Sequence, residues 1–156
     1  MKRDFIGYGK QKPKIFWPQN NKIAVSFVVN IEEGAELSIS SGDSQNEHVY
    51  ENNKTKILDF PDLCMESHFE YGLRSGIWRI FNIFDKYNVK ATFSCCSLAL
   101  EKSPWLIDEI LKRNHEISAH GVKWISHAYL KREEEKKIIN ECYSSILKLS
   151  GHPPVG

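Results

Sequence analysis

The chain has 156 residues, of which 41% are hydrophobic and 26% charged, and its formal net charge is +1. This size and composition fit one soluble globular domain over residues 1–156, and the near-zero charge argues against nucleic-acid or anionic-membrane partners. No apolar run approaches the roughly 20 residues that span a bilayer, and Met1–Asp4 lacks the apolar core of a secretion signal, so we expect a cytoplasmic protein.

The first predicted element is a strand over residues 23–29, an apolar run broken only by Ser26. A run without alternation is typical of a strand that is covered on both faces, as in parallel sheets. The polar stretch from Ser38 to Asp59 then indicates a long loop, and long loops in compact domains tend to be functional or disordered.

Helices and strands alternate after this loop. Apolar residues at helical spacing predict a helix carrying Ile77, Ile80, Phe81 and Phe84, and residues 90–96 predict the second strand. Ser103 and Pro104 form a helix start signal, an N-cap followed by proline at the first helical position. The helix that they begin carries Leu106, Ile107, Ile110 and Leu111.

Residues 116–120 predict a short third strand, and a last helix ends at Gly151 and Pro153. This helix places Ile138, Ile139, Cys142, Ile146 and Leu149 on one stripe. Alternating strands and helices imply an α/β fold with parallel pairing and right-handed crossovers. Three strand–helix units are too few to close a barrel.

The four cysteines indicate buried, reduced thiols. Cys64, Cys95, Cys96 and Cys142 show no Cys-x-x-Cys spacing, so neither a zinc knuckle nor a redox pair is indicated. The neighbours Cys95 and Cys96 point to opposite faces of the predicted strand. Reduced thiols fit the cytosol.

Polar side chains follow the first and third predicted strands. Asn30 and Glu32 share one face of their strand, whereas Glu33 points away, and His120 ends the third strand. In a parallel array, Glu32 and His120 can converge on one cavity, where a carboxylate activates water and an imidazole transfers a proton. The alternatives are that Glu32 caps loop N–H groups and that His120 is structural.

Other residues give weaker signals. The remaining histidines are expected to be surface or loop residues: His48, His68, His115, His127 and His152. No two histidines lie three or four residues apart, and Trp124 stands four residues after His120, so no local zinc motif is present. The segment 65–79 fits either a helix with Arg–Glu pairs and aromatic packing or a segment that contacts substrate or another subunit.

Together, these motifs resemble the polysaccharide deacetylase (NodB-type) family, and within it most closely the branch of deacetylase-like allantoinases and peptidoglycan deacetylase-like proteins. The resemblance rests on segments in family order: residues 4–9, Trp17-Pro18, residues 30–36, Met65-Glu66-Ser67, Glu70-Tyr71-Gly72, residues 76–79, Ala91-Thr92-Phe93, and residues 116–121 with Trp124. It implies part of a deformed (β/α) barrel, shortened after about three β/α units, because family members continue past residues 153–156.

The resemblance also implies hydrolysis of carbon–nitrogen bonds other than peptide bonds. Asn30 and Glu32 match the two aspartates of the family's first motif, which supply a catalytic base and a metal ligand. His120 matches the first metal-binding histidine, and Trp124 replaces the second. This pattern favours a metal-independent, allantoinase-like enzyme acting on a cyclic ureide.

In that interpretation Glu32 orients or activates water, and His120 steadies the oxyanion or protonates the leaving nitrogen. Asn30 bonds the substrate, and Glu33, Trp124 and Glu66 are assigned to substrate binding.

Two alternatives remain open. The first is a metal-dependent N-deacetylase of peptidoglycan or chitooligosaccharide, in which Glu32 and His120 bind zinc or another divalent ion with His127 or Asp43 as a further ligand. The second is an inactive fragment that needs another chain to complete the barrel, because an open sheet edge exposes unpaired backbone. Homo-oligomerisation is compatible with each interpretation.

Overall fold

The structure is a computed structural model that describes residues 3–47 and 58–156. Its centre is a parallel sheet of β1 (Val28–Ile31), β2 (Thr92–Cys95) and β3 (Glu116–Ala119), in the order β1-β2-β3. The register aligns Asn30 with Ser94 and Ser94 with Ser118. The predicted parallel pairing is therefore confirmed, and the carboxyl ends of the strands meet at one edge.

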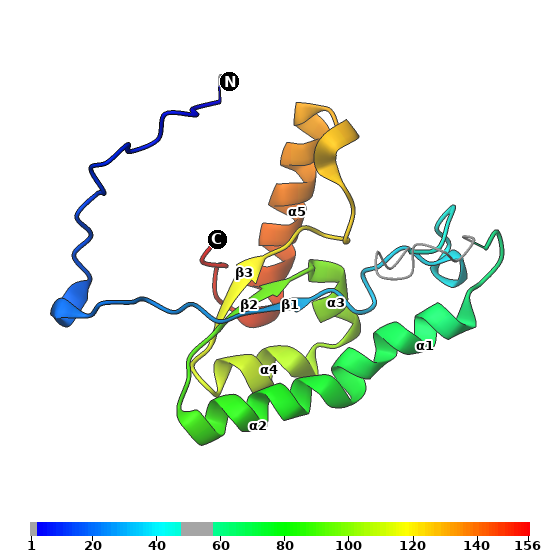
Figure 1. Ribbon diagram of the computed structural model, residues 1–156. Helices are drawn as coiled ribbons and strands as arrows, with labels where there is room; N and C mark the ends of the chain where they lie inside the picture. The colour runs from blue at the N-terminus through cyan, green and yellow to red at the C-terminus, as the bar shows by residue number, and fades with distance from the viewer. Residues whose placement is uncertain (1–2, 48–57) are drawn as a thin grey trace.

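Helices connect and cover these strands. They are α1 (Leu63–Tyr71), the π-helical segment η4 (Gly72–Gly76), α2 (Ile77–Tyr87), α3 (Ser97–Lys102), α4 (Trp105–Leu111) and α5 (Arg132–Ser150), with 3-10 turns η1 (Pro18–Asn20), η2 (Ile39–Ser41) and η5 (His127–Tyr129). Figure 1 shows α2 and α4 running along the same side of the sheet. The rings of Trp78 and Trp105 stack between these two helices, with centroids 5.2 Å apart.

The core lies on one face of the sheet. Side chains alternate along the strands, so Ile31, Phe93, Cys95 and Ile117 are buried against helices that contribute Phe81, Leu106, Ile110 and Ile146. The opposite face carries Val28, Asn30, Thr92, Ser94, Glu116 and Ser118, which are exposed or half-buried. The expectation that the first strand is covered on both faces is therefore wrong for the described residues.

The first strand also lies later in the chain than predicted. Its ladder covers residues 28–31, because its partner β2 begins only at Thr92. Residues 23–27 resemble a strand in composition, but Ile23 is 74% exposed and Val25 is 69% exposed. The Phe27 carbonyl accepts from Thr92 N–H, but in the described chain no ladder pairs residues 23–26 with a neighbouring strand, and apolar residues alone do not form one.

The other helix predictions need smaller corrections. Ser103 makes no side-chain cap, and α4 begins after Pro104 with a backbone bond from Leu106 N–H to the Ser103 carbonyl. On α5, Cys142 and Ile146 are buried as predicted, but Ile139 is 53% exposed. The helix ends at Gly151, whose φ of 73° is the left-handed conformation expected of a glycine C-cap.

Asn46 connects the two described parts of the polar segment after β1. Asn46 is buried, its Oδ1 accepts from Ile39 N–H, and its amide donates to the carbonyls of Leu58 and Phe60. The middle of the predicted 38–59 loop, including His48, lies outside the described residues. No helix in the described part of the chain is long and apolar enough to cross a membrane.

Candidate functional site

Glu32 and His120 meet at the carboxyl edge of the sheet. Glu32 follows β1 and His120 follows β3, and Glu32 Oε1 lies 3.0 Å from His120 Nε2. The side chain of Glu32 is 20% exposed and that of His120 is 33% exposed, so solvent reaches both. The predicted convergence of these two groups is present in the structure, and it provides a carboxylate and an imidazole within proton-transfer distance.

Glu32 and His120, called the dyad below, lie on either side of the carboxyl end of the central strand β2. The ladder aligns Ile31, Cys95 and Ala119, so Cys96 is the next residue between Glu32 and His120. Cys96 N–H donates to the Ile31 carbonyl, and His120 N–H donates to the Cys95 carbonyl, both at 2.9 Å. Backbone bonds to one strand end therefore fix the separation of the two catalytic candidates.

Asn30 and Trp124 lie near this edge in different ways. Asn30 is in β1 with an exposed side chain, two residues before Glu32 and on the same face by strand alternation. Trp124 packs against the core, and its N–H donates to the Ala35 carbonyl at 3.0 Å. Among the described residues, no side-chain hydrogen bond joins either of them to the dyad.

Glu33 points away from Glu32, as predicted from strand alternation. Its Oε2 accepts from Glu32 N–H at 3.2 Å, and burial raises the pKa of its carboxyl. The carboxylate occupies the space beside Gly72, where an added Cβ would lie 1.7 Å from Glu33 Oε1. Gly72 therefore provides the room in which the Glu33 side chain lies.

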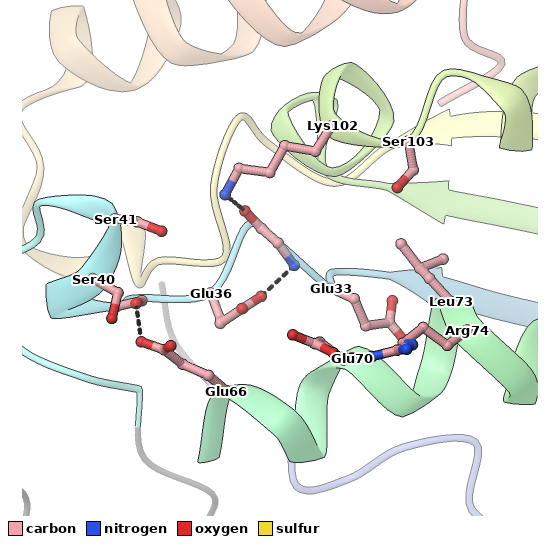
Figure 2. Close-up of a pocket in the computed structure, with 12 residues that line it drawn as sticks. Glu33, Glu36, Ser40, Ser41, Glu66, Glu70, Leu73, Arg74, Lys102 and Ser103 are labelled. Atoms are coloured by element: carbon pink, nitrogen blue, oxygen red, sulfur yellow. Dashed lines mark hydrogen bonds and ion pairs between the residues drawn. The ribbon is translucent and has the colours of Figure 1, made fainter. Parts of the chain in front are cut away.

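Glu33 and Glu66 line a cavity of about 370 Å³. It lies between the segment after β1, the helical segments α1 and η4, and the end of α3. Figure 2 shows Glu66 and Glu70 reaching toward it from α1 and Lys102 pointing toward the segment after β1. Ser38 Oγ donates to Glu66 Oε1 at 2.7 Å, and hydroxyl bonds from Ser40 and Ser38 lower the pKa of Glu66.

This cavity separates the predicted binding residues into two groups. Glu33 and Glu66 line it, whereas Glu32, His120, Asn30 and Trp124 do not. The segment 65–79 forms the helix with an Arg–Glu pair that was its first alternative, and contact with substrate or another subunit stays a prediction. Arg74 pairs with Glu70 at 2.7 Å as in a solvated helix, and both residues also line the cavity.

The residues proposed as further metal ligands have other partners. Lys123 Nζ lies 2.5 and 2.6 Å from the two carboxylate oxygens of Asp43, and this bond lowers the pKa of Asp43. His127 Nδ1 lies 3.3 Å from Glu135 Oε1. Within residues 3–47 and 58–156, no group of three or more His, Cys, Asp or Glu side chains is placed to hold a metal ion. The donors among these described residues do not by themselves form a three-ligand metal centre.

His115 corrects the expectation of a surface histidine. It is 6% exposed, its ring packs among Phe81, Phe84 and Phe93, and its Nδ1 accepts from Ala91 N–H at 3.2 Å. Burial lowers its pKa. Its position directly before a predicted strand gave no signal of burial, because the aromatic neighbours come from distant parts of the sequence.

The chain matches known proteins over most of its length. Residues 59–156 match the family described as polysaccharide deacetylase. A Schizosaccharomyces pombe protein whose name assigns it to the polysaccharide deacetylases is 36% identical in an alignment of length 154 that covers 95% of this chain and 48% of that protein.

Two crystal structures cover the whole chain. The Puue allantoinase superposes with a TM-score of 0.90 at 35% identity, and the chain covers 52% of it. A Pseudomonas aeruginosa PAO1 structure named for the polysaccharide deacetylases gives 0.91 at 35% identity, with 53% covered. The chain thus spans about half the length of these relatives. The expected α/β fold, part of a deformed (β/α) barrel of the polysaccharide deacetylase type, is confirmed.

Proposed function

Because the chain belongs to the polysaccharide deacetylase family, we propose that Glu32 and His120 form the acid–base pair of a hydrolase for carbon–nitrogen bonds other than peptide bonds. The observation that carries this proposal is the 3.0 Å contact between Glu32 Oε1 and His120 Nε2 at a solvent-accessible strand edge. A carboxylate and an imidazole at this distance can exchange a proton without moving.

In the proposed reaction Glu32 is the general base and His120 is the general acid. Water attacks the substrate carbonyl carbon while Glu32 takes one of its protons, and a new carbon–oxygen bond forms. The carbon–nitrogen bond then breaks as His120 donates a proton to the leaving nitrogen. Transfer of the proton from Glu32 to His120 along their hydrogen bond restores the starting state. Each positioned acid or base typically contributes about 10²–10⁴ in rate.

We propose a cyclic ureide of the allantoin type as substrate. The support is the likeness over the full chain to an allantoinase, at 35% identity and a TM-score of 0.90. The exposed Asn30 amide on the same face as Glu32 can both donate and accept a hydrogen bond with a ring amide. Trp124 would provide an apolar wall, and Glu33 and Glu66 would bind substrate from the neighbouring cavity.

N-acetylated sugars of peptidoglycan or chitooligosaccharide are the alternative substrates. The support is the match to the polysaccharide deacetylase family and the hydroxyl- and carboxylate-rich lining of the 370 Å³ cavity. In this alternative, Glu32 and His120 would bind zinc or another divalent ion with ligands from outside the described residues.

The test compares allantoin ring opening with release of acetate from chitooligosaccharide, each measured before and after chelation. Allantoin turnover that survives chelation and is lost in Glu32→Gln supports the proposed substrate. Acetate release that chelation abolishes supports the sugar deacetylase. Allantoin turnover that is unchanged in Glu32→Gln would contradict the proposed acid–base pair.

A second candidate is that the chain acts only with further β/α units that complete the barrel, on another polypeptide or in a homo-oligomer. Residues 3–27 extend away from the sheet in Figure 1 and expose Phe5, Ile6, Tyr8, Ile15, Phe16, Ile23 and Val25. The outer edge of β1 has no strand partner among the described residues. Apolar surface beside a free strand edge favours association.

Size-exclusion chromatography tests this second candidate. A chain that self-associates, or gains activity when mixed with the remaining half of the Schizosaccharomyces pombe relative, supports it. A monomer with a cooperative melting transition and unaided turnover contradicts it.

We also propose a cytoplasmic location, since Cys95, Cys96 and Cys142 are buried free thiols, as expected in a reducing compartment.

A further inference from the structure

Two buried thiols contact the backbone that carries His120. Cys142 on α5 donates from Sγ to the Gly121 carbonyl at 3.1 Å, and Cys96 donates from Sγ to the His120 carbonyl at 3.4 Å. Both cysteines are fully buried, and they reach consecutive peptide groups from different elements. The two thiols are thus directed at the adjacent carbonyls of His120 and Gly121.

Further backbone bonds complete this arrangement. The Gly121 carbonyl also accepts from Ser97 N–H at 3.0 Å, and the Val122 carbonyl accepts from Leu98 N–H at 3.1 Å. Gly121 has a φ of +84°, a conformation that favours glycine and turns its carbonyl toward the first residues of α3. The peptide groups around His120 are therefore bonded to β2, α3 and α5 at once.

The thiols are able to act as donors. Burial raises the pKa of the Cys96 thiol to about 12 and also raises the pKa of the Cys142 thiol, so both carry their proton near neutral pH. Cys96 is also bonded to the other side of the site, because its N–H donates to the Ile31 carbonyl, one residue before Glu32. Cys96 thus bonds the backbone of His120 and the backbone one residue before Glu32.

We propose that Cys96 and Cys142 are positioning residues that hold the His120–Gly121 backbone and thereby keep the imidazole opposite Glu32. The inference rests on the proposed role of His120 in hydrolysis. A histidine held only by its own rotamer would sample other orientations, and a misplacement of about 1 Å can cost about 10²-fold in rate. The two thiols limit that freedom without touching the substrate.

The test uses the whole chain with ¹⁵N-labelled histidine, and the His120 ring signals are assigned with His120→Gln. Cys96→Ala and Cys142→Ala remove the donors, and Cys96→Ser and Cys142→Ser restore a donor of similar size. Cys95→Ala is the matched control, since Cys95 is equally buried but its Sγ donates to the Phe93 carbonyl at 3.3 Å. Denaturant unfolding is measured for every variant.

In the unmodified chain and in Cys95→Ala, we expect His120 ring nitrogen shifts that report a hydrogen bond to Glu32. In Cys96→Ala and Cys142→Ala, these shifts should move toward those of Glu32→Gln, and the serine variants should recover them. Where turnover is measurable, kcat should fall about 10-fold or more in the alanine variants with KM little changed, as expected when positioning at the reacting centre is lost.

Two outcomes would overturn the proposal: folded alanine variants that keep the unmodified His120 spectrum, or an equal change in Cys95→Ala. If the alanine variants do not fold, the S–H stretching bands of the unmodified chain decide, because bands of free thiols for Cys96 and Cys142 would contradict donation. The ring spectra need no turnover. A chain inactive on allantoin and chitooligosaccharide would therefore refute the proposed function but leave this test intact.

Discussion

β3 has a histidine at each end, His115 just before its first residue and His120 just after its last. His115 is 6% exposed, and its ring lies among three phenylalanine rings, with Nδ1 accepting a backbone N–H. His120 is 33% exposed and lies beside a carboxylate. The same residue type on one strand is therefore a packing element at the amino end and a proton-transfer candidate at the carboxyl end.

The difference shows that a histidine's role depends on what its ring nitrogens meet. Surroundings of aromatic rings favour a neutral His115, because burial opposes its charged form. The ring of His120 instead meets the Glu32 carboxylate and solvent, the partners that a proton-transferring imidazole requires. If this comparison is correct, substitutions at the two positions should separate stability from activity.

The largest expected effect is on the activity of His120→Ala. We expect kcat to fall about 10²–10³-fold, as for removal of one group that stabilises a transition state. The free energy of unfolding should change by about 1 kcal/mol or less, because the ring is partly exposed and its contact with Glu32 is a part-solvated pair. Steady-state kinetics and urea unfolding provide the two values. Unchanged turnover would show that His120 does not take part in the reaction.

The converse substitution, His115→Ala, should cost about 2–4 kcal/mol of stability, as for truncation of other large buried side chains. It removes a ring whose centroid lies 5.1 Å from that of Phe93 and leaves the Ala91 N–H without its acceptor. Urea unfolding measures the loss, and kcat of the folded fraction should stay within a few-fold. A loss of kcat as large as that in His120→Ala would show that the histidine at the amino end of β3 also contributes to activity.

Gly72→Ala tests whether packing also positions the Glu33 side chain, which follows the carboxyl end of β1. The added Cβ would displace the Glu33 carboxylate and break its bond to Glu32 N–H, at a cost of about 1 kcal/mol. Gly76→Ala is the control in the same segment, since its Cβ would meet Tyr71 at 3.4 Å, an ordinary contact, and gain up to about 1 kcal/mol of helix propensity. Equal stabilities of the two variants would contradict the interpretation of Gly72.

The smallest effect is a pH dependence from His115. Its pKa is lowered in the folded chain, chiefly by burial and then by Lys90 and Arg113, with Asp85 opposing them. Between the folded pKa and the value near 6.5 of an exposed histidine, the unfolded chain binds more protons. Stability should therefore be complete above about pH 6.5 and decrease as the pH falls toward the folded pKa.

His115→Phe should remove this part of the pH dependence. Urea unfolding at several pH values checks it, with His120→Gln as the control that keeps His115. A slope that persists unchanged in His115→Phe would assign the effect to another group.

The sequence predicted the parallel pairing of the strands and the meeting of Glu32 with His120, because side-chain alternation along a strand and the alternation of strands with helices can be read from the chain. It could not place β1 correctly, since the apolar residues 23–26 satisfy the same local rule but pair with no neighbouring strand in the described chain. It also missed α3, whose first turn is defined by backbone bonds to Gly121 and Val122 rather than by a start signal. The burial of His115 and the fit of Glu33 against Gly72 depend on segments far apart in sequence.

Cys64 offers a site for selective labelling of the chain. It is the exposed one of the four cysteines, and it lies on α1 two residues before Glu66, while the other three thiols are buried. A maleimide dye would therefore react at a single position without any substitution. Attached there, the fluorophore would report directly on molecules that enter the cavity lined by Glu33 and Glu66.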